Sequence, residues 1–302
     1  MALSACASAP PAPVPMPGPD PDPGPVVIPA QPTPSGKSQK LTRYYGRLQG
    51  NLLTQGLLRT DGGGIDTPYT DTDLLRNFEQ VVFYDEYAPG RGFKRSDGKS
   101  GALRKWTVPV RIAVEFGASV SADQRATDSE MIARYAARLS RITDHPISAS
   151  NLNPNFYVMI MGEDDRAEAL ARIKQIVPGI DPSSLTVFRN LPRSTHCLVV
   201  AFSSPDNKYS YRRAIAFIRA EHPPLLRQSC IHEEIAQGLG LANDSPRARP
   251  SIFNDDDEFA LLTTQDEDML RLLYNPALSP GMTAAEARPI LQRLILGQSG
   301  PS

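Results

Sequence analysis

Several features that mark common protein classes are missing from this 302-residue sequence. The 32 basic and 33 acidic residues nearly cancel, and no Lys/Arg-rich stripe follows any expected helix, so the charge pattern of a nucleic-acid-binding protein is absent. After the chain start, no apolar run approaches the roughly 18 residues of a membrane-spanning helix. Neither Gly-x-Ser-x-Gly nor Gly-x-x-x-x-Gly-Lys occurs, which excludes a serine nucleophile elbow and a phosphate-binding loop of those types. We therefore expect no nucleic-acid partner.

Histidine and cysteine are scarce, with 4 and 3 copies in the chain. His145, His196 and His222 lie far apart without the spacing of metal ligands, so each is expected at the surface or as a capping group. The acidic run at residues 255–258 is a candidate calcium ligand set, but charge runs are usually solvated loops. We expect no cofactor.

The chain start resembles the lipobox of bacterial lipoproteins. In Leu3-Ser4-Ala5-Cys6, the resemblance implies cleavage before Cys6 and lipidation of its sulfur, so residues 1–5 are the remnant of a signal peptide. A secretory signal needs a positive stretch and an apolar segment of roughly 7 to 15 residues. Because five residues supply neither, the true start codon is expected upstream. The alternative is a chance match of four residues.

A proline-rich segment follows Cys6. Twelve of the 29 prolines lie between Pro10 and Pro34, a composition that favours extended polyproline II and cannot build a core. Residues 6–40 are thus expected to form the lipidated cysteine and a tether, which would hold a folded domain at a membrane through its lipid. This predicts a membrane-anchored, periplasm-facing protein of the cell envelope. The alternative for this segment is an ordinary disordered tail.

Cys197 and Cys230 remain if Cys6 carries a lipid. In an oxidising compartment they could form one disulfide, closing a loop of about 33 residues and adding roughly 3 to 4 kcal/mol of stability. Two buried thiols are the alternative, because disulfide geometry is demanding.

Periodicity predicts the order of the main elements. We expect an extended, polar lead-in over residues 41–69, with one helix completing the lead-in of residues 41–105, then a main domain over 106–296 and a tail over 297–302. Strand, helix, strand, helix, two strands and a helix indicate an α+β or α/β domain with one mixed sheet. The expected helices are 71–84, 121–142, 167–176 and 225–240, and the expected strands are 106–116, 156–161, 197–202 and 214–218.

The helix expected over residues 225–240 has two distinct faces. Ile231, Ile235 and Leu239 recur on one face, as in a helix that packs on a core. Glu233 and Gln237, four residues apart, lie together on another face. Gly240 is suited to end the helix.

This helix resembles the zinc-binding helix of the metzincin metallopeptidases. Their signature, His-Glu-x-x-His-x-x-Gly-x-x-His, places three histidines around zinc and a glutamate that activates water. Here Glu234 stands at the general-base position and Gly240 matches the glycine, but Glu233, Gln237 and Asn243 stand at the ligand positions. His232 lies one residue early and would point about 100° away.

A second stretch of the resemblance lies downstream. Ser251-Ile252-Phe253-Asn254 resembles the methionine-containing turn beneath the metal, with Phe253 in the Met place. Residues 262–266, Leu-Thr-Thr-Gln-Asp, resemble the opening of the last catalytic-domain helix. The resemblance implies an α+β single domain with a mixed twisted sheet, a long backing helix and a central, degenerate active-site helix. The arrangement is also similar to a bacterial lipoprotein family known only as domain of unknown function family 2927.

Two functions follow from this interpretation. Zinc prefers nitrogen and thiolate ligands, which favours a metal-free site in which Glu233, Gln237 and Asn243 converge and hydrogen-bond to one another above Phe253. We therefore expect a catalytically degenerate binding or structural module that holds a peptide, a glycan or an envelope protein. The alternative is a divergent hydrolase with Glu234 as its base.

Overall fold

The computed structural model describes residues 33–85, 96–254 and 256–298. These all belong to one compact unit, Gln31–Ser302. The predicted lipidation at Cys6 and most of the predicted tether lie outside the described residues. Within the described ranges, none of the helices combines the length and the apolar character needed to cross a membrane.

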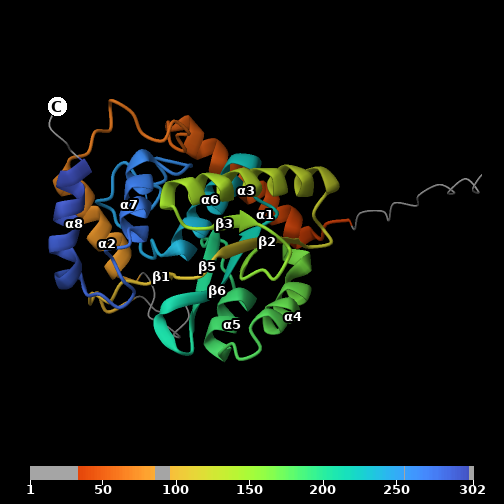
Figure 1. The fold of residues 1–302 in the computed structure, drawn as a ribbon. Helices are drawn as coiled ribbons and strands as arrows, with labels where there is room; N and C mark the ends of the chain where they lie inside the picture. Colours follow the sequence, from red (N-terminus) through yellow and green to blue (C-terminus); the bar gives the residue numbers. More distant parts are fainter. Residues whose placement is uncertain (1–32, 86–95, 255, 299–302) are drawn as a thin grey trace, which may run out of the picture. The chain divides into compact units, whose positions relative to one another are not determined.

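A mixed sheet forms the centre of this unit, as expected (Figure 1). The strands follow the order β1-β6-β4-β2-β3, all parallel, and β5 runs antiparallel along the other side of β6. Among the described strands, β5 is therefore an edge strand. The bounds are β1 Lys105–Trp106, β2 Val110–Phe116, β3 Ile147–Ala149, β4 Phe156–Met161, β5 Cys197–Ser204 and β6 Asn207–Arg219.

The sheet is buried on both faces at its central strand β4, which is apolar at every position. Alternate residues of β4 contribute to two cores: Phe156, Val158 and Ile160 to one, and Tyr157, Met159 and Met161 to the other. In Figure 1, α3 (Ala122–Thr143) and α6 (Pro224–Leu239) cover one face, and α4 (Arg166–Ile176) and α5 (Pro182–Arg189) cover the opposite face. Such two-sided burial is typical of mainly parallel sheets.

Several predicted elements are confirmed. Helix α2 (Asp71–Phe83) begins at a capping box made by Thr70 and Asp73, and α3 begins at the N-cap Ser121. Helix α7 (Thr264–Tyr274) likewise begins at a capping box, made by Thr263 and Asp266. Each of these boundaries is set by a side chain that accepts a hydrogen bond from an otherwise unpaired helical N–H.

The prediction of an extended lead-in over residues 41–69 is wrong, because helix α1 spans Gly36–Thr54. Its polar residues and glycines suggested a loop, but Leu41, Tyr45, Leu48 and Leu52 recur at helical spacing, and Tyr45 and Leu52 are buried. The helix therefore forms because one face packs against the domain. The lead-in of residues 41–105 holds two helices where one was predicted.

Three further differences concern the other elements. The expected strand 106–116 is broken at Pro109, which has no N–H for a sheet, and its halves pair with different strands: β1 with β6, and β2 with β3 and β4. Helices α5 and α8 (Ala284–Gln298) were not predicted. Pro289 lies inside α8 and weakens its local helix pattern, whereas Pro182 occupies the first position of α5, where proline is favourable. A 3-10 turn, η1 (Glu163–Asp165), precedes α4.

Candidate functional site

Helix α6 is held rigidly against the rest of the domain. Ile231, Ile235 and Leu239 form its predicted apolar back and are each 0% exposed. Arg227 also makes a buried ion pair with Asp128 of α3, with 2.8 Å between Nε and Oδ2. Because both the apolar and the charged contacts lie on the inner side of α6, its opposite face is presented in a defined orientation.

The end of α6 requires a glycine, as predicted. Gly240 has a φ of 129°, and a Cβ there would lie 2.5 Å from the carbonyl oxygen of Arg104. The last carbonyl groups of the helix receive hydrogen bonds from distant side chains, Trp106 Nε1 to Gly238 O and Tyr274 Oη to Leu239 O. The chain can therefore turn sharply after α6 without leaving these carbonyls unpaired.

A cleft of about 910 Å³ lies between the outer face of α6 and the edge strand β5. Glu233, Glu234 and Gln237 line it from α6, and residues 197–203 line it from β5. Glu234 is 3% exposed, so its carboxyl group is largely withdrawn from solvent. Glu233 and Gln237 therefore share one face of α6, as predicted, and this face lines the cleft.

Asn243 does not join this group, so the expected convergence of Glu233, Gln237 and Asn243 is wrong. The Asn243 amide donates to the backbone oxygen of Gln80 on α2 (2.9 Å), and its backbone N–H donates to Val81 O. Asp244 lines the cleft instead and accepts a hydrogen bond from Gln237 Nε2 at 3.0 Å. The backbone carbonyls in the last turn of α2 have no partner within the helix, so two of them can accept hydrogen bonds from the side chain and the backbone N–H of Asn243.

His232 is directed away from the cleft, as its helical position predicted. It is 5% exposed, its ring is stacked on Tyr135 at 3.9 Å, and its Nδ1 accepts a hydrogen bond from the backbone N–H of Leu262. Burial lowers the pKa of His232 to about 3. The residue is therefore a neutral core histidine that connects α6 to α3.

Phe253 is fully buried in a turn that helix α7 supports. The Asp266 carboxylate accepts hydrogen bonds from Ser251 Oγ and Ile252 N in the turn, and from Thr263 N and Oγ1 at the start of α7. Burial raises the pKa of Asp266 to about 6, although these four donors favour its ionised form. One carboxylate thus joins the two downstream segments singled out in the sequence.

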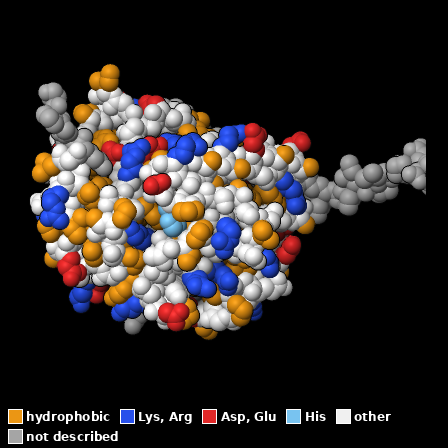
Figure 2. All heavy atoms as spheres, in the orientation of Figure 1, with side chains coloured by type: hydrophobic (Ala, Val, Ile, Leu, Met, Phe, Trp, Pro, Cys, Tyr) orange, Lys and Arg blue, Asp and Glu red, His pale blue; other side chains and the backbone are white. Residues whose placement is uncertain are grey.

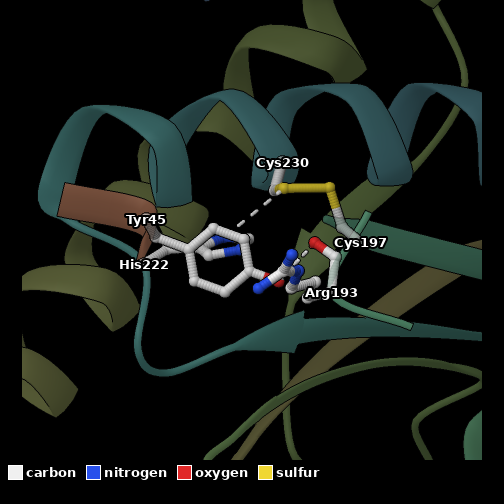
Figure 3. Close-up of a disulfide and its surroundings, with 5 residues drawn as sticks. All are labelled: Tyr45, Arg193, Cys197, His222 and Cys230. Atoms are coloured by element: carbon white, nitrogen blue, oxygen red, sulfur yellow. Dashed lines mark hydrogen bonds between the residues drawn. A yellow bond between two sulfur atoms is a disulfide. The ribbon is translucent and has the colours of Figure 1, made fainter. Parts of the chain in front are cut away.

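The predicted disulfide between Cys197 and Cys230 is present, with 5.8 Å between the Cα atoms (Figure 3). It connects the first residue of β5 to the middle of α6, at one end of the cleft. Beside it, Tyr45 packs against His222 with 4.3 Å between ring centroids, and Tyr45 Oη donates to Arg193 O. His222 is 2% exposed, so the expectation of a surface or capping histidine is wrong for it.

Glu233 and Gln237 are poor donors for a catalytic zinc ion, and among the described lining residues the imidazole is that of His196. Glu233 supplies a carboxylate and Gln237 an amide, whereas zinc prefers imidazole and thiolate groups. The Cys197 sulfur and carboxylate oxygens of Glu233 and Glu234 lie within 4.8 Å of one another, but a disulfide sulfur is not a thiolate. Glu233 and Gln237 therefore suit hydrogen bonding better than zinc coordination.

A family model described as Protein of unknown function (DUF2927) matches residues 71–293. The chain belongs to this family. No curated protein and no solved structure matches it significantly. The part matched to DUF2927 begins with α2 and ends within α8, so it includes both cysteines of the disulfide and the whole of α6.

Sequence reasoning missed two contributors to the cleft. One is the backbone of β5, which was predicted as a strand without being placed at an edge. The other is Asp257, which the sequence indicated only as part of the acidic run at residues 255–258 and which lines the cleft together with Asp244. A signal for Asp244 existed in its position directly after Asn243, because a tight turn can exchange the directions of neighbouring side chains. No local pattern indicated which of the two would face the cleft.

Proposed function

We propose that this member of the family is a non-catalytic binding module of the bacterial cell envelope, whose cleft holds an extended basic peptide along β5. The observation that supports this proposal most directly is the position of β5 at an edge of the described sheet. Among the described strands it pairs with β6 alone, and residues 197–203 border a cleft of about 910 Å³. Backbone groups on the outer side of an edge strand can pair with an added peptide strand.

The charge of the cleft supports a basic ligand. Arg104 is ion-paired with Asp85, so acidic groups predominate among the other lining side chains. A partner with Lys or Arg side chains would complement this field, which favours its association and its orientation. The charged lining residues are Asp85, Asp181, Glu233, Glu234, Asp244 and Asp257 against Arg104 and Lys208.

The envelope location rests on the chain start. Cys6 in a lipobox-like sequence and the proline-rich segment after it support a lipid-anchored protein whose domain extends from a membrane. A disulfide between Cys197 and Cys230 is consistent with an oxidising compartment. We propose a periplasm-facing lipoprotein on these grounds.

A degenerate metzincin-like domain explains why the cleft would bind without cleaving. Glu233 and Gln237 face the cleft from the positions of two metal ligands, and Glu234 from the position of the base. Water that is not bound to a metal keeps a pKa far above neutral pH, so a carboxylate base alone accelerates its attack little. Shape and charge would remain while water activation is lost.

Peptide binding can be tested with fluorescent peptides of about nine residues, a length that suits strand addition. The peptides alternate Ser and Val around a central Arg, Ala or Glu. We expect the Arg peptide to bind about tenfold more tightly than the Glu peptide, because the cleft is acidic. N-methylation of alternate backbone amides should abolish binding in one register and spare it in the other, as strand pairing requires.

Two variants make this test specific. Glu233→Gln should reduce the preference for Arg, whereas Glu130→Gln, on the exposed side of α3 with 72% of its side chain accessible, should leave it unchanged. Equal binding of all three peptides, or insensitivity to N-methylation in both registers, would contradict the proposal.

A divergent hydrolase is the second candidate, and the burial of Glu234 in the cleft favours it. A carboxylate withdrawn from solvent is a common general base. Internally quenched peptides incubated with the purified chain would reveal turnover. Turnover that Glu234→Gln abolishes, with binding retained, would establish the hydrolase and refute a purely non-catalytic module.

A further inference from the structure

A second pocket, of about 330 Å³, lies apart from the cleft, and four of its eight lining residues are basic. It is formed by the first turns of α1, by η1, by the segment after α5 and by the end of β6. Its lining residues are Lys37, Lys40, Leu41, Tyr44, Glu163, Leu191, Arg193 and Arg219. This concentration of positive charge contrasts with the mixed charges on the face shown in Figure 2, where basic and acidic side chains are interspersed.

Helix α1 supplies two exposed cations of this pocket, Lys37 and Lys40. It contains no acidic residue, and Lys37, Lys40, Arg43 and Arg47 are all exposed. At 100° per residue these four lie within one sector of roughly 120°, opposite the buried residues Tyr45 and Leu52. The sequence analysis found no Lys/Arg stripe along the predicted helices, but α1, which was not predicted as a helix, carries one.

Arg219 forms the buried base of the pocket. It is 1% exposed, and its Nη2 donates to the backbone oxygens of Leu191 and Pro192 at 2.7 and 3.0 Å. Its Nη1 lies 3.6 Å from Glu163 Oε2, and its Nε is buried without a hydrogen-bond acceptor among the described residues. A buried N–H of a charged group without an acceptor is unfavourable, so this arginine retains donor capacity for a ligand.

The one acidic residue of the lining is already neutralised. Glu163 makes ion pairs with Lys37 and Arg166. Arg193 is positioned by the ring of Tyr44, which lies 4.9 Å from its guanidinium carbon. Lys40, Arg193 and Arg219 therefore surround the pocket as positive groups from three different segments of the chain.

We propose that this pocket binds a phosphate-type oxyanion, with Arg219 at its base and Lys40 and Arg193 at its rim. Arginine forks and lysine ammonium groups are the usual donors to phosphate oxygens, and the volume accommodates a single phosphate-bearing group. The same chemistry is offered by a soluble phosphate and by a phospholipid head group. This site is independent of the peptide-binding cleft.

The test uses the full chain and defined probes at constant ionic strength. Inorganic phosphate and glycerol 3-phosphate are titrated calorimetrically, and flotation is measured with phosphatidylcholine vesicles with and without phosphatidylglycerol. Saturable binding of the soluble phosphates would assign a small anion, and binding only to phosphatidylglycerol vesicles would assign a lipid head group. Either result supports the proposal if it depends on the pocket.

A matched pair of double variants decides that dependence. Lys40→Gln with Arg193→Gln removes two charges at the pocket, and Arg43→Gln with Arg47→Gln removes two from the same exposed face outside it. The pocket variant should weaken binding at least about tenfold, and the control should change it less than about twofold. Circular dichroism verifies that both variants fold. The absence of binding to every probe, or equal weakening by the two variants, would overturn the proposal.

Discussion

Removing the disulfide should destabilise the domain strongly while leaving its sheet intact. Cys197 and Cys230 are separated by 33 residues, and closing such a loop in the unfolded chain lowers its entropy by an amount equivalent to about 4 kcal/mol at 25 °C. The eight-residue strand β5 remains paired with β6 without the bond. The loss should therefore appear in the unfolding equilibrium rather than in the native secondary structure.

The perturbation is Cys197→Ala with Cys230→Ala, made in a Cys6→Ser background so that no other thiol interferes. Alanine is chosen because Cys230 is 2% exposed, and a serine there would bury a hydroxyl group. For a domain of this size about 4 kcal/mol corresponds to a fall in Tm of about 8 to 15 °C. Thermal unfolding followed by circular dichroism, with and without a phosphine reductant, measures it.

The reductant provides the control for this prediction. It should lower the Tm of the Cys6→Ser parent to nearly that of the double variant and leave the double variant unchanged. A double variant within about 1 kcal/mol of its parent would refute the inference that this bond restricts the unfolded chain. A reductant effect of equal size on both proteins would point to an unrelated cause.

Three further predictions concern stability. Burial lowers the pKa of His232 to about 3 from 6.5, so its contribution to the free energy of unfolding is complete above about pH 6.5 and is lost as the pH falls towards 3, by up to about 5 kcal/mol. Denaturant unfolding at several pH values should therefore show that the unfolding free energy of His232→Asn falls less steeply with acid than that of the wild type. Burial raises the pKa of Asp266 to about 6 from 3.8, so its contribution to the free energy of unfolding is complete below about pH 3.8 and declines as the pH rises through 6. Over that interval the difference in unfolding free energy between the wild type and Asp266→Asn should shrink by up to about 3 kcal/mol. A constant difference would contradict the assignment. Gly240→Ala should lower the unfolding free energy by about 2 kcal/mol or more, because its positive φ is strained for alanine and the added Cβ would contact the Arg104 carbonyl oxygen. The control Gly46→Ala, inside α1 with nothing within 4 Å of the added Cβ, should raise it by about 0.5 to 1 kcal/mol. Equal effects of the two substitutions would refute the reasoning.

Elements with strong local patterns were predictable. Helix α3 has a capping serine and a regular apolar stripe, and β4 is apolar throughout. Helix α1 was missed because its few apolar residues stabilise it only when they pack against the rest of the domain. The break at Pro109 could be suspected from the proline, but the different partners of β1 and β2 depend on sheet topology.

The candidate site divides in the same way. Glu233 and Gln237 were correctly placed together, because helical geometry alone relates residues four apart. Asn243 and Asp244 follow Gly240, where the helix has ended, and backbone acceptors on α2 determine which one leaves the cleft. Contacts over this range of sequence have no local signature.

By itself, the sequence determined the elements whose side chains repeat with a helical or strand period, the faces of α6, the Gly240 stop and the pairing partners available to the cysteines. Those properties depend on neighbours within a few residues, so they can be derived without a fold. Tertiary structure alone decided that β5 lies at an edge beside an acidic cleft, that Asp244 replaces Asn243 there, and that Lys40, Arg193 and Arg219 meet in one pocket. Their proximity arises from packing between segments far apart in the chain, which no local periodicity specifies.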